Sequence, residues 1–338
     1  MKRIGFLSFG HYRAVVGARV PDAAAALRQH VAFAEAADEV GLDGAWVRVH
    51  HFEESHATPF PLLAAMAAVT SRIDVGTGVV DLRYENPLHM AEQAAATDLI
   101  SGGRLQLGVS RGSPEHAADG EKQFGYRLTD GESWADHAQA KVARFRRAIA
   151  GEPVAHSAAA QFSGDGPDLP IRPISPGLPD RIWWGAGSVE SGVWTAEQGM
   201  NLLSSTLLLA DDGRPFHVQQ ADQVRSYRRV FRRMGHPGPG LTAVTRPVFP
   251  ITNDDDRRYF GLRGDAHDSV GILDGSKARS GPQMVGTVEE VAELLRADEA
   301  VTEADYVLFA MPSQLGVDYN VHWMENLVAV ARELGWKE

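Results

Sequence analysis

Short apolar runs alternate with longer amphipathic or alanine-rich segments through most of the chain. The short runs have the length of β-strands, and the longer segments have the length and spacing of helices. Eight segments are interpreted as strands: Arg3–Phe9, Gly44–His50, Ile73–Val80, Leu105–Ser110, Arg181–Ala186, Asn201–Leu208, Leu241–Phe249 and Asp305–Ala310. Parallel neighbours need helical crossovers, and eight strand–helix pairs close a barrel. The pattern therefore predicts an α/β protein with a (β/α)8 TIM-barrel fold, in one domain over residues 1–338.

Residues at the expected helix ends support this alternation. Asp22 can cap the first helix, which continues through Val40 and stops at a glycine. The pairs Thr58–Pro59 and Asn86–Pro87 each place a capping residue before a proline in the first helical turn. Thr287–Glu290 has the capping-box spacing. Each helix is thus expected to start and end where the strand pattern requires.

Two segments interrupt the alternation and are expected to be insertions, at about 151–180 and 250–285. The first is rich in proline, glycine and alanine, and the second carries charge and glycine with little periodicity. The second segment is a candidate mobile lid because it contains Gly261, Gly264, Gly271 and Gly275. A doubly wound open sheet is the alternative fold. It is disfavoured because no G-x-G-x-x-G follows the first strand.

Composition restricts the environment and the partners. The chain has 338 residues, a net charge of −11 and no cysteine. The longest basic cluster is RRVFRR at 228–233, which suits a solvated helix face, so nucleic acid is not an expected partner. Without cysteine there is no disulfide, thiolate metal site or cysteine nucleophile. No apolar run approaches the length of about 20 residues that spans a membrane, and MKRIGFLSFG is interpreted as the first strand rather than a signal peptide. We predict a soluble cytoplasmic protein.

Barrel sites form at the C-terminal ends of strands, so the residues there are the candidates for chemistry. Two histidines, His50 and His51, end the second strand, and glycines cluster at the ends of strands three, four and five. Glycine within a strand often marks the close approach of a ligand. The GAGSVES sequence at 185–191 opens a helix with glycine and serine, which suits an anion such as phosphate, and Arg111 can bind the same anion. Together these features indicate a flat, nucleotide-like cofactor with a phosphate tail.

Each of these features also has an ordinary structural explanation. A histidine on a strand is often a satisfied structural residue, Arg111 can form a structural ion pair, and glycine–serine at a helix start is often only an N-cap. His50, His51 and Glu53 could bind a metal. Barrel metal sites, however, need ligands from several strands, and only Asp81 stands out at another strand end. No metal is therefore expected.

Three segments carry a resemblance to a known family: GAWVRVHHF, SRIDVGTGVVDLRYENPLHMAEQAAATDLISGGRLQLGVSRG and VGTVEEVAELL. They resemble the bacterial luciferase-like, flavin-dependent monooxygenases. The resemblance implies a (β/α)8 barrel that binds FMN, receives it reduced from a separate flavin reductase, and uses O2 to oxidise a small organic substrate through a C4a-peroxyflavin. It also implies a homodimer, because relatives commonly form dimers.

The resemblance assigns roles to individual residues. His50 matches the catalytic histidine, and Gly78–Val79 falls where the family often has a non-proline cis peptide under the flavin ring. The remaining implied cofactor-binding residues are Ser110 beside the flavin, Arg111 near its phosphate, Gly187, Ser188 and Ser191 in the phosphate-binding turn, and Ser204 and Thr206 flanking the ring.

One departure leaves the chemistry open. The residue before the paired histidines is often glutamate in the family, and here it is Val49. This departure gives weight to a flavin-binding protein without catalysis, which is one alternative to an FMN monooxygenase. A deazaflavin-dependent oxidoreductase of the same superfamily is a second alternative that stays open. A metal-dependent barrel hydrolase built on the histidine pair is a fourth hypothesis.

Overall fold

Eight parallel strands close into a barrel in the computed structural model, which describes residues 2–13, 17–112, 117–157, 168–209, 211–261, 267–273 and 276–338. The barrel strands are β1 (Arg3–Ser8), β2 (Gly44–Val47), β3 (Asp74–Asp81), β4 (Leu105–Ser110), β7 (Ile182–Ala186), β8 (Asn201–Ser204), β10 (Thr242–Arg246) and β15 (Tyr306–Met311). Their order around the barrel is β1-β15-β10-β8-β7-β4-β3-β2. The predicted (β/α)8 TIM barrel is therefore confirmed.

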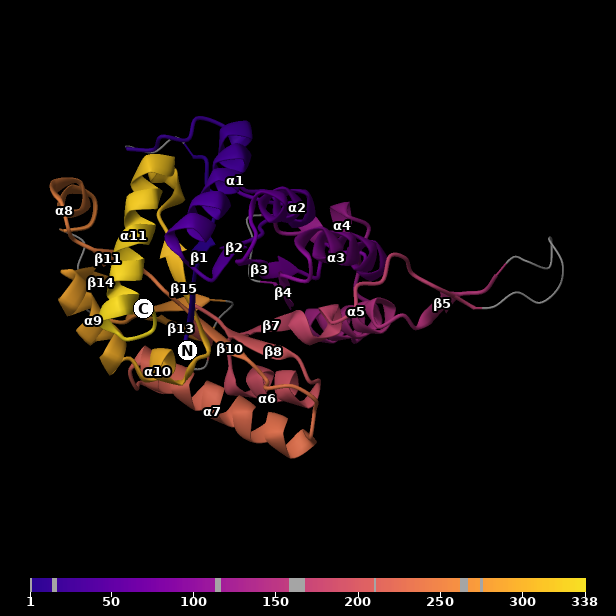
Figure 1. Ribbon diagram of the computed structural model, residues 1–338. Helices are drawn as coiled ribbons and strands as arrows, with labels where there is room; N and C mark the ends of the chain where they lie inside the picture. The colour runs from indigo at the N-terminus through magenta and orange to yellow at the C-terminus, as the bar shows by residue number, and fades with distance from the viewer. Residues whose placement is uncertain are drawn as a thin grey trace.

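Helices surround the strands (Figure 1). The long ones are α1 (Ala23–Val40), α2 (Pro59–Val69), α3 (Pro87–Ser101), α5 (Trp134–Ile149), α6 (Val189–Glu197), α7 (Phe216–Met234), α9 (Val288–Ala297) and α11 (Val317–Glu333). The short ones are α4 (Gly120–Gln123), α8 (Asp254–Phe260), α10 (Glu299–Glu303) and the 3-10 turns η2 (Leu178–Arg181) and η3 (Ser313–Leu315). None of the helices in the described parts of the chain combines the length and apolar composition that a membrane span needs.

The predicted helix caps are present, with one difference. The Asp22 carboxylate accepts from the Ala25 N–H at 2.7 Å, and Asn86 accepts from the N–H of Leu88 at 2.9 Å. The capping box of Thr287 and Glu290 is formed in both directions. Thr58 occupies the N-cap position of α2, but its side chain makes no capping hydrogen bond there. Local capping chemistry thus sets most of the helix starts.

The barrel interior is filled by large side chains from several strands. Its core consists of Leu7, Trp46, Trp183, Leu203, Ala243, Tyr306 and Leu308. The Trp46 ring packs edge-on against Trp183 and Tyr306, both at 5.5 Å between ring centroids. Gly76 makes room for this ring, because a Cβ there would lie 2.8 Å from it. The filled interior leaves space for a ligand only at the end of the barrel.

Three predicted strands end three or more residues earlier than expected. The second ends at Val47 rather than His50, because the His50 N–H bonds to the His56 carbonyl at 2.9 Å instead of to a neighbouring barrel strand. The sixth ends at Ser204, and the seventh divides into β10 and β11 (Val248–Pro250). In each case the apolar residues continue past the point where the backbone leaves the barrel. The hydrophobic pattern alone therefore predicted strand ends that lie too far along the sequence.

The insertions have more structure than their composition suggested. In the first, β5 (Pro153–Ala155) pairs with β6 (Leu169–Pro170) in a hairpin that projects from the barrel (Figure 1). In the second, β14 (Met284–Gly286) pairs with β11, while β12 (Ser269–Leu273) and β13 (Ser276–Ser280) form a sheet with β9 (Leu208–Leu209). The lid hypothesis was based in part on Gly264 and Gly275, which lie outside the described residues. Lid motion stays a prediction.

Candidate functional site

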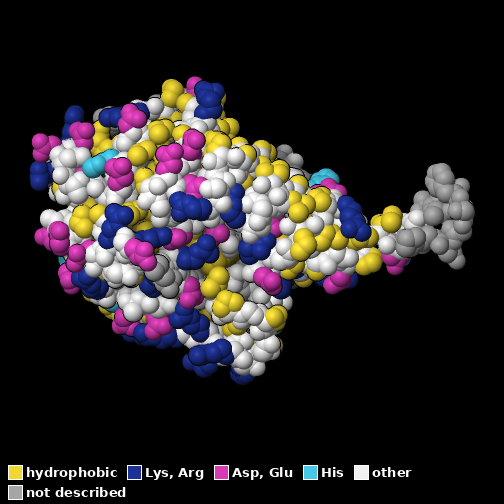
Figure 2. Space-filling model, in the orientation of Figure 1, with side chains coloured by type: hydrophobic (Ala, Val, Ile, Leu, Met, Phe, Trp, Pro, Cys, Tyr) yellow, Lys and Arg dark blue, Asp and Glu magenta, His cyan; other side chains and the backbone are white. Residues whose placement is uncertain are grey.

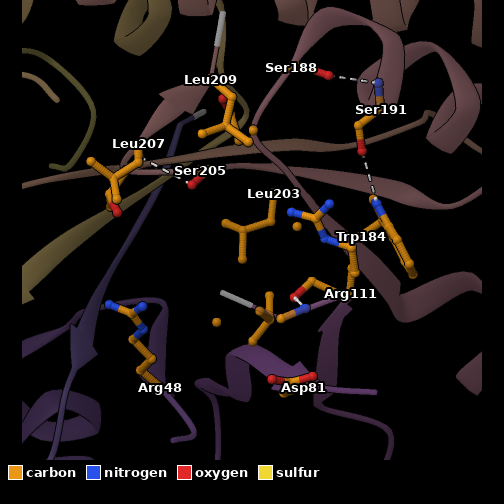
Figure 3. Close-up of a pocket in the computed structure, with 18 of the residues that line it drawn as sticks. Arg48, Asp81, Arg111, Trp184, Ser188, Ser191, Leu203, Ser205, Leu207 and Leu209 are labelled. Carbon is orange, nitrogen blue, oxygen red and sulfur yellow. Dashed lines mark hydrogen bonds between the residues drawn. The ribbon is translucent and has the colours of Figure 1, made fainter. Parts of the chain in front are cut away.

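A cavity of about 460 Å³ opens at the C-terminal ends of the barrel strands. Figure 3 shows residues that converge on it from both sides of the barrel. All ten site residues chosen from the sequence line this cavity: His50, Gly78, Val79, Ser110, Arg111, Gly187, Ser188, Ser191, Ser204 and Thr206. They come from β3, β4, β8 and α6 and from the segments that follow β2, β4, β7 and β8. The fold therefore brings the candidates together, while their chemical roles stay predictions.

The backbone at the end of β3 forms part of the cavity wall. The Gly78–Val79 peptide bond is cis, as the resemblance led us to expect. A Cβ at Gly78 would lie 3.0 Å from Leu7, and a Cβ at Gly185 would lie 3.1 Å from Val79. A side chain at either position would crowd its neighbours in the cavity wall, and glycine at such positions often marks the close approach of a ligand.

The two consecutive histidines have different surroundings. His50 lines the cavity and is mostly buried. His51 is buried in an aromatic cluster, with its ring centroid 4.3 Å from that of Tyr84 and 5.1 Å from that of Phe124. Phe52, the next residue, has a left-handed backbone with φ of 57°. The turn after β2 thus directs the His50 ring to the cavity and the His51 ring into the aromatic cluster.

The end of β4 combines a cation with a buried carboxylate. Arg111 is exposed and lines the cavity. The Ser110 hydroxyl accepts from the Gly112 N–H at 2.9 Å. Gly112 has φ of 91°, and a Cβ there would lie 2.1 Å from an oxygen of Asp81. Asp81 in turn accepts from Arg83 at 2.5 Å, so its negative charge is compensated within the protein.

The start of α6 has the geometry of an anion site. Ser188 is the N-cap, and its hydroxyl accepts from the Ser191 N–H at 3.2 Å (Figure 3). The Ser191 hydroxyl accepts from Trp184 Nε1 at 3.2 Å, so its own proton is directed elsewhere. A helix start presents further backbone N–H groups and a partial positive charge. The capping explanation of the Gly–Ser turn is therefore correct, and it is compatible with anion binding.

The end of β8 is held by a buried glutamine. Ser204 donates to Gln223 Oε1, and Gln223 Nε2 donates to the carbonyls of Ala186 at 3.1 Å and Ser188 at 2.7 Å. Gln223 therefore ties the end of β8 to the turn before α6. Thr206 follows the strand in a bend rather than lying on it as predicted.

Several lining residues were not singled out from the sequence as ligand contacts. They include Phe9, Arg48, Gln139, Glu190, Trp194, Leu207, Leu209 and Thr245. Arg48 could have been found, because it shares the alternation face of Trp46 and His50. Gln139 lies on α5 and Leu209 on β9, and neither segment carries a sequence signal for this site.

A charged cluster lies beside the segment that follows β3. Lys141 Nζ donates to the Leu82 carbonyl at 2.9 Å and lies 3.3 Å from the centroid of the Tyr126 ring. Burial raises the pKa of the Glu85 carboxyl to about 7, although Lys141 opposes this shift. Burial likewise lowers the pKa of Lys141 to about 8. Burial thus moves the pKa values of both groups towards neutrality.

The donor set suits a phosphorylated planar cofactor better than a metal. Within the described residues, no three histidine, aspartate or glutamate side chains come together as a metal site would require. A metal hydrolase built on His50, His51 and Glu53 therefore has no structural support. Arg111, Ser191 and the α6 N-terminus offer hydrogen-bond donors for a phosphate, while the glycine-lined floor offers space for a ring.

The fold and cavity define a (β/α)8-barrel protein with its ligand site at the C-terminal ends of the strands. The family model described as luciferase-like monooxygenase matches residues 3–260. The chain belongs to the luciferase-like monooxygenase family.

Similar proteins include both oxygenases and a dehydrogenase. Limonene 1,2-monooxygenase of Rhodococcus erythropolis is 32% identical over 152 residues, covering 44% of this chain and 38% of that protein. F420-dependent glucose-6-phosphate dehydrogenase of Amycolatopsis mediterranei is 41% identical over 93 residues, 25% of this chain and 27% of that one. The chain thus spans less than two thirds of the length of the curated relatives it matches.

A solved structure extends the likeness to nearly the whole chain. The oxygenating constituent of the Pseudomonas putida 3,6-diketocamphane monooxygenase, in complex with FMN, has a TM-score of 0.69. It is 17% identical, and the alignment covers 97% of each chain. This likeness supports the fold.

Proposed function

We propose that the protein is a monooxygenase that uses reduced FMN and O2 to oxidise a small organic substrate. The observation that supports this proposal most directly is that His50, Arg111, the start of α6 and several glycines all line one cavity. Family membership supports an oxygenase or oxidoreductase activity. We further propose that a separate flavin reductase supplies the reduced cofactor and that the protein forms a homodimer in the cytoplasm.

The protein groups have distinct tasks in this proposal. Arg111, Ser191 and the first N–H groups of α6 would hold the phosphate, and Gly78–Val79 with Gly185 would support the ring. Bound reduced flavin would supply the electrons that activate O2. Leu7, Leu203 and other apolar lining residues exclude water from the reacting region. His50, which lines the same cavity, would hold or deliver a proton.

A cofactor titration tests the proposal. Purified protein is titrated anaerobically with FMN in both redox states and with F420, and O2 uptake is then followed with reduced FMN and candidate substrates. We expect reduced FMN to bind and product to carry one oxygen atom from labelled O2. Failure to bind either redox state of FMN would exclude the proposal.

Binding of F420 in this titration is a second outcome, and one of the similar proteins gives it specific support. The dehydrogenase among the relatives uses F420, so tight F420 binding with oxygen-independent turnover would indicate hydride transfer instead. Binding of oxidised FMN without O2 consumption would indicate a flavin-binding protein. Val49 stands at the position where the resembled family often has glutamate, which makes this outcome worth measuring.

His50→Asn tests the catalytic assignment. The substitution should lower kcat by about 100-fold or more and change the Kd for FMN little, because proton transfer typically contributes that much to a rate. His89→Asn, on the exposed start of α3, is the matched control. Equal turnover in the His50 variant and the control would remove this imidazole from the mechanism.

A further inference from the structure

A buried side-chain amide binds the turn between β7 and α6. Gln223 lies on α7, is 1% exposed and is not among the residues that line the cavity. Ser204 donates to its Oε1, and its Nε2 donates to the carbonyls of Ala186 at 3.1 Å and Ser188 at 2.7 Å. The oxygen and both amide hydrogens therefore have partners, which gives the buried amide one preferred orientation.

The aliphatic part of Gln223 is also held in place. Helices α6 and α7 lie side by side (Figure 1), and Gly192 of α6 lies against this glutamine. A Cβ at Gly192 would lie 3.1 Å from the Gln223 Cγ. The glycine thus allows α6 to approach the glutamine closely, and the close packing leaves the amide little freedom to bind elsewhere.

The carbonyl groups of the turn determine where its N–H groups point. Gln223 binds the carbonyls of Ala186 and Ser188, and the Leu209 N–H donates at 2.8 Å to the carbonyl of Gly187 between them. In a planar trans peptide unit, the C=O and the following N–H point in opposite directions. The three N–H groups that follow these carbonyls are therefore held on the side of the turn away from the groups that bind the carbonyls.

We propose that Gln223 is a positioning residue that makes this site selective for a phosphorylated flavin, FMN, over riboflavin. The inference rests on the proposed function, because the phosphate belongs to the cofactor proposed there. Gln223 does not touch the cofactor in this scheme. It holds the N–H donors of the turn in the arrangement that an anion needs. Donors that are already oriented lose less entropy on binding, so loss of the glutamine should weaken phosphate binding and leave the space for the ring unchanged.

FMN and riboflavin share the same ring and differ in the phosphate, so the ratio of their Kd values reports on the phosphate site. Fluorescence titration with the two oxidised flavins measures both constants. We expect wild-type protein to bind FMN about 100-fold more tightly, since two charge-assisted hydrogen bonds contribute about tenfold each. Gln223→Met keeps the length of the side chain but removes its donors. It should lower the ratio about tenfold, with little change in the Kd for riboflavin.

Two further variants complete the experiment. Gln219→Met is the matched control, because Gln219 lies one turn earlier on α7, is 8% exposed and donates to the Arg214 carbonyl at 2.6 Å. It should leave the ratio unchanged. Ser204→Ala keeps Gln223 but removes the hydroxyl that orients its amide, so it should lower the ratio by a smaller factor, about threefold. Circular dichroism shows whether each variant is folded.

The possible failures are distinguishable. Wild-type protein without a preference for FMN, or a ratio that is the same in Gln223→Met and Gln219→Met, would overturn the inference. Equal weakening of both flavins in Gln223→Met would show a purely structural role and would overturn it as well. If Gln223→Met does not fold, an unchanged ratio in Ser204→Ala overturns the inference and a lowered ratio supports it. If the ratio falls as expected but wild-type protein consumes no O2 with reduced FMN, the proposed function fails and the role of Gln223 stands.

Discussion

Replacing Arg246 by methionine should remove the cation from a buried ion pair while keeping most of the apolar volume. Arg246 is the last residue of β10 and is 1% exposed. Its Nε and Nη2 donate to the two carboxylate oxygens of Asp298 at 2.7 and 3.0 Å. The preceding residue, Thr245, lines the cavity, so Arg246 points outward into the layer beneath the helices. The pair joins the barrel wall to the segment before β15.

The expected cost follows from the burial of the partner left behind. Asp298 is 4% exposed, and it also caps α10 by accepting from the Val301 N–H at 2.9 Å. Removing one member of a buried pair leaves an uncompensated charge, which typically costs about 3–5 kcal/mol. The exposed pair Arg147–Glu152 is the matched comparison, with side chains 68% and 48% exposed. Arg147→Met should cost no more than about 1 kcal/mol.

Urea unfolding followed by circular dichroism measures both variants, and a double variant separates the charge effect from lost packing. Arg246→Met combined with Asp298→Ala should be destabilised by less than the sum of the two single variants, by about 1 kcal/mol or more. The reasoning is refuted if Arg246→Met unfolds at the same urea concentration as Arg147→Met, or if the single effects add.

Three further predictions concern a glycine in the cavity wall and the pH dependence of folding stability. Gly112→Ala should destabilise the protein by about 2 kcal/mol in urea and weaken FMN binding in a titration, because the added Cβ meets Asp81 at a left-handed backbone position. Glu85→Gln should gain stability relative to wild type between pH 5 and pH 8 in urea unfolding. The pKa of Glu85 rises from 4.5 to about 7 on folding, so its charged form costs stability as the pH rises through that window. His56→Phe should reduce the acid sensitivity of urea stability, because burial lowers the pKa of His56 to about 4 and the wild type loses stability as the pH falls from about 6.5 to 4.

Each of these predictions has a contrary outcome. Unchanged stability of Gly112→Ala would mean that the backbone there adapts freely. A constant stability difference between Glu85→Gln and wild type across the pH range would show that the carboxyl titrates normally. An acid profile of His56→Phe that matches wild type would show that another group causes the acid loss.

Local sequence signals predicted the barrel well because they act over a few residues. The caps at Asp22 and Asn86 and the capping box at Thr287 act within one helical turn. The strand ends were less predictable, since β2 stops where the His50 N–H meets the His56 carbonyl across a turn. In the sheet of β12, β13 and β9, the paired strands β13 and β9 are about 70 residues apart, and neither segment has a strong pattern of its own.

The charged side chains on the surface also show which features the sequence predicts and which depend on the fold. Composition predicted a net negative charge without a basic patch for nucleic acid, and Figure 2 shows acidic and basic side chains interspersed over the visible face. The RRVFRR segment lies on α7 with Val230 and Phe231 buried, and its Arg228 binds Glu303 at 3.3 Å, as the nearby Arg225 does at 3.0 Å. The sequence could count these charges, but only the fold placed the acidic partners opposite them.

The sequence by itself determined the number and order of the strand–helix units, and hence the end of the barrel at which ligand-binding residues gather. Hydrophobic period and capping are properties of short segments, so they survive without a fold. Tertiary structure alone decided that His50 faces the cavity while His51 packs against Tyr84, and that Arg48 and Arg111 approach from different sides. Those choices depend on closure of the barrel, which fixes the distances between residues that are far apart along the chain.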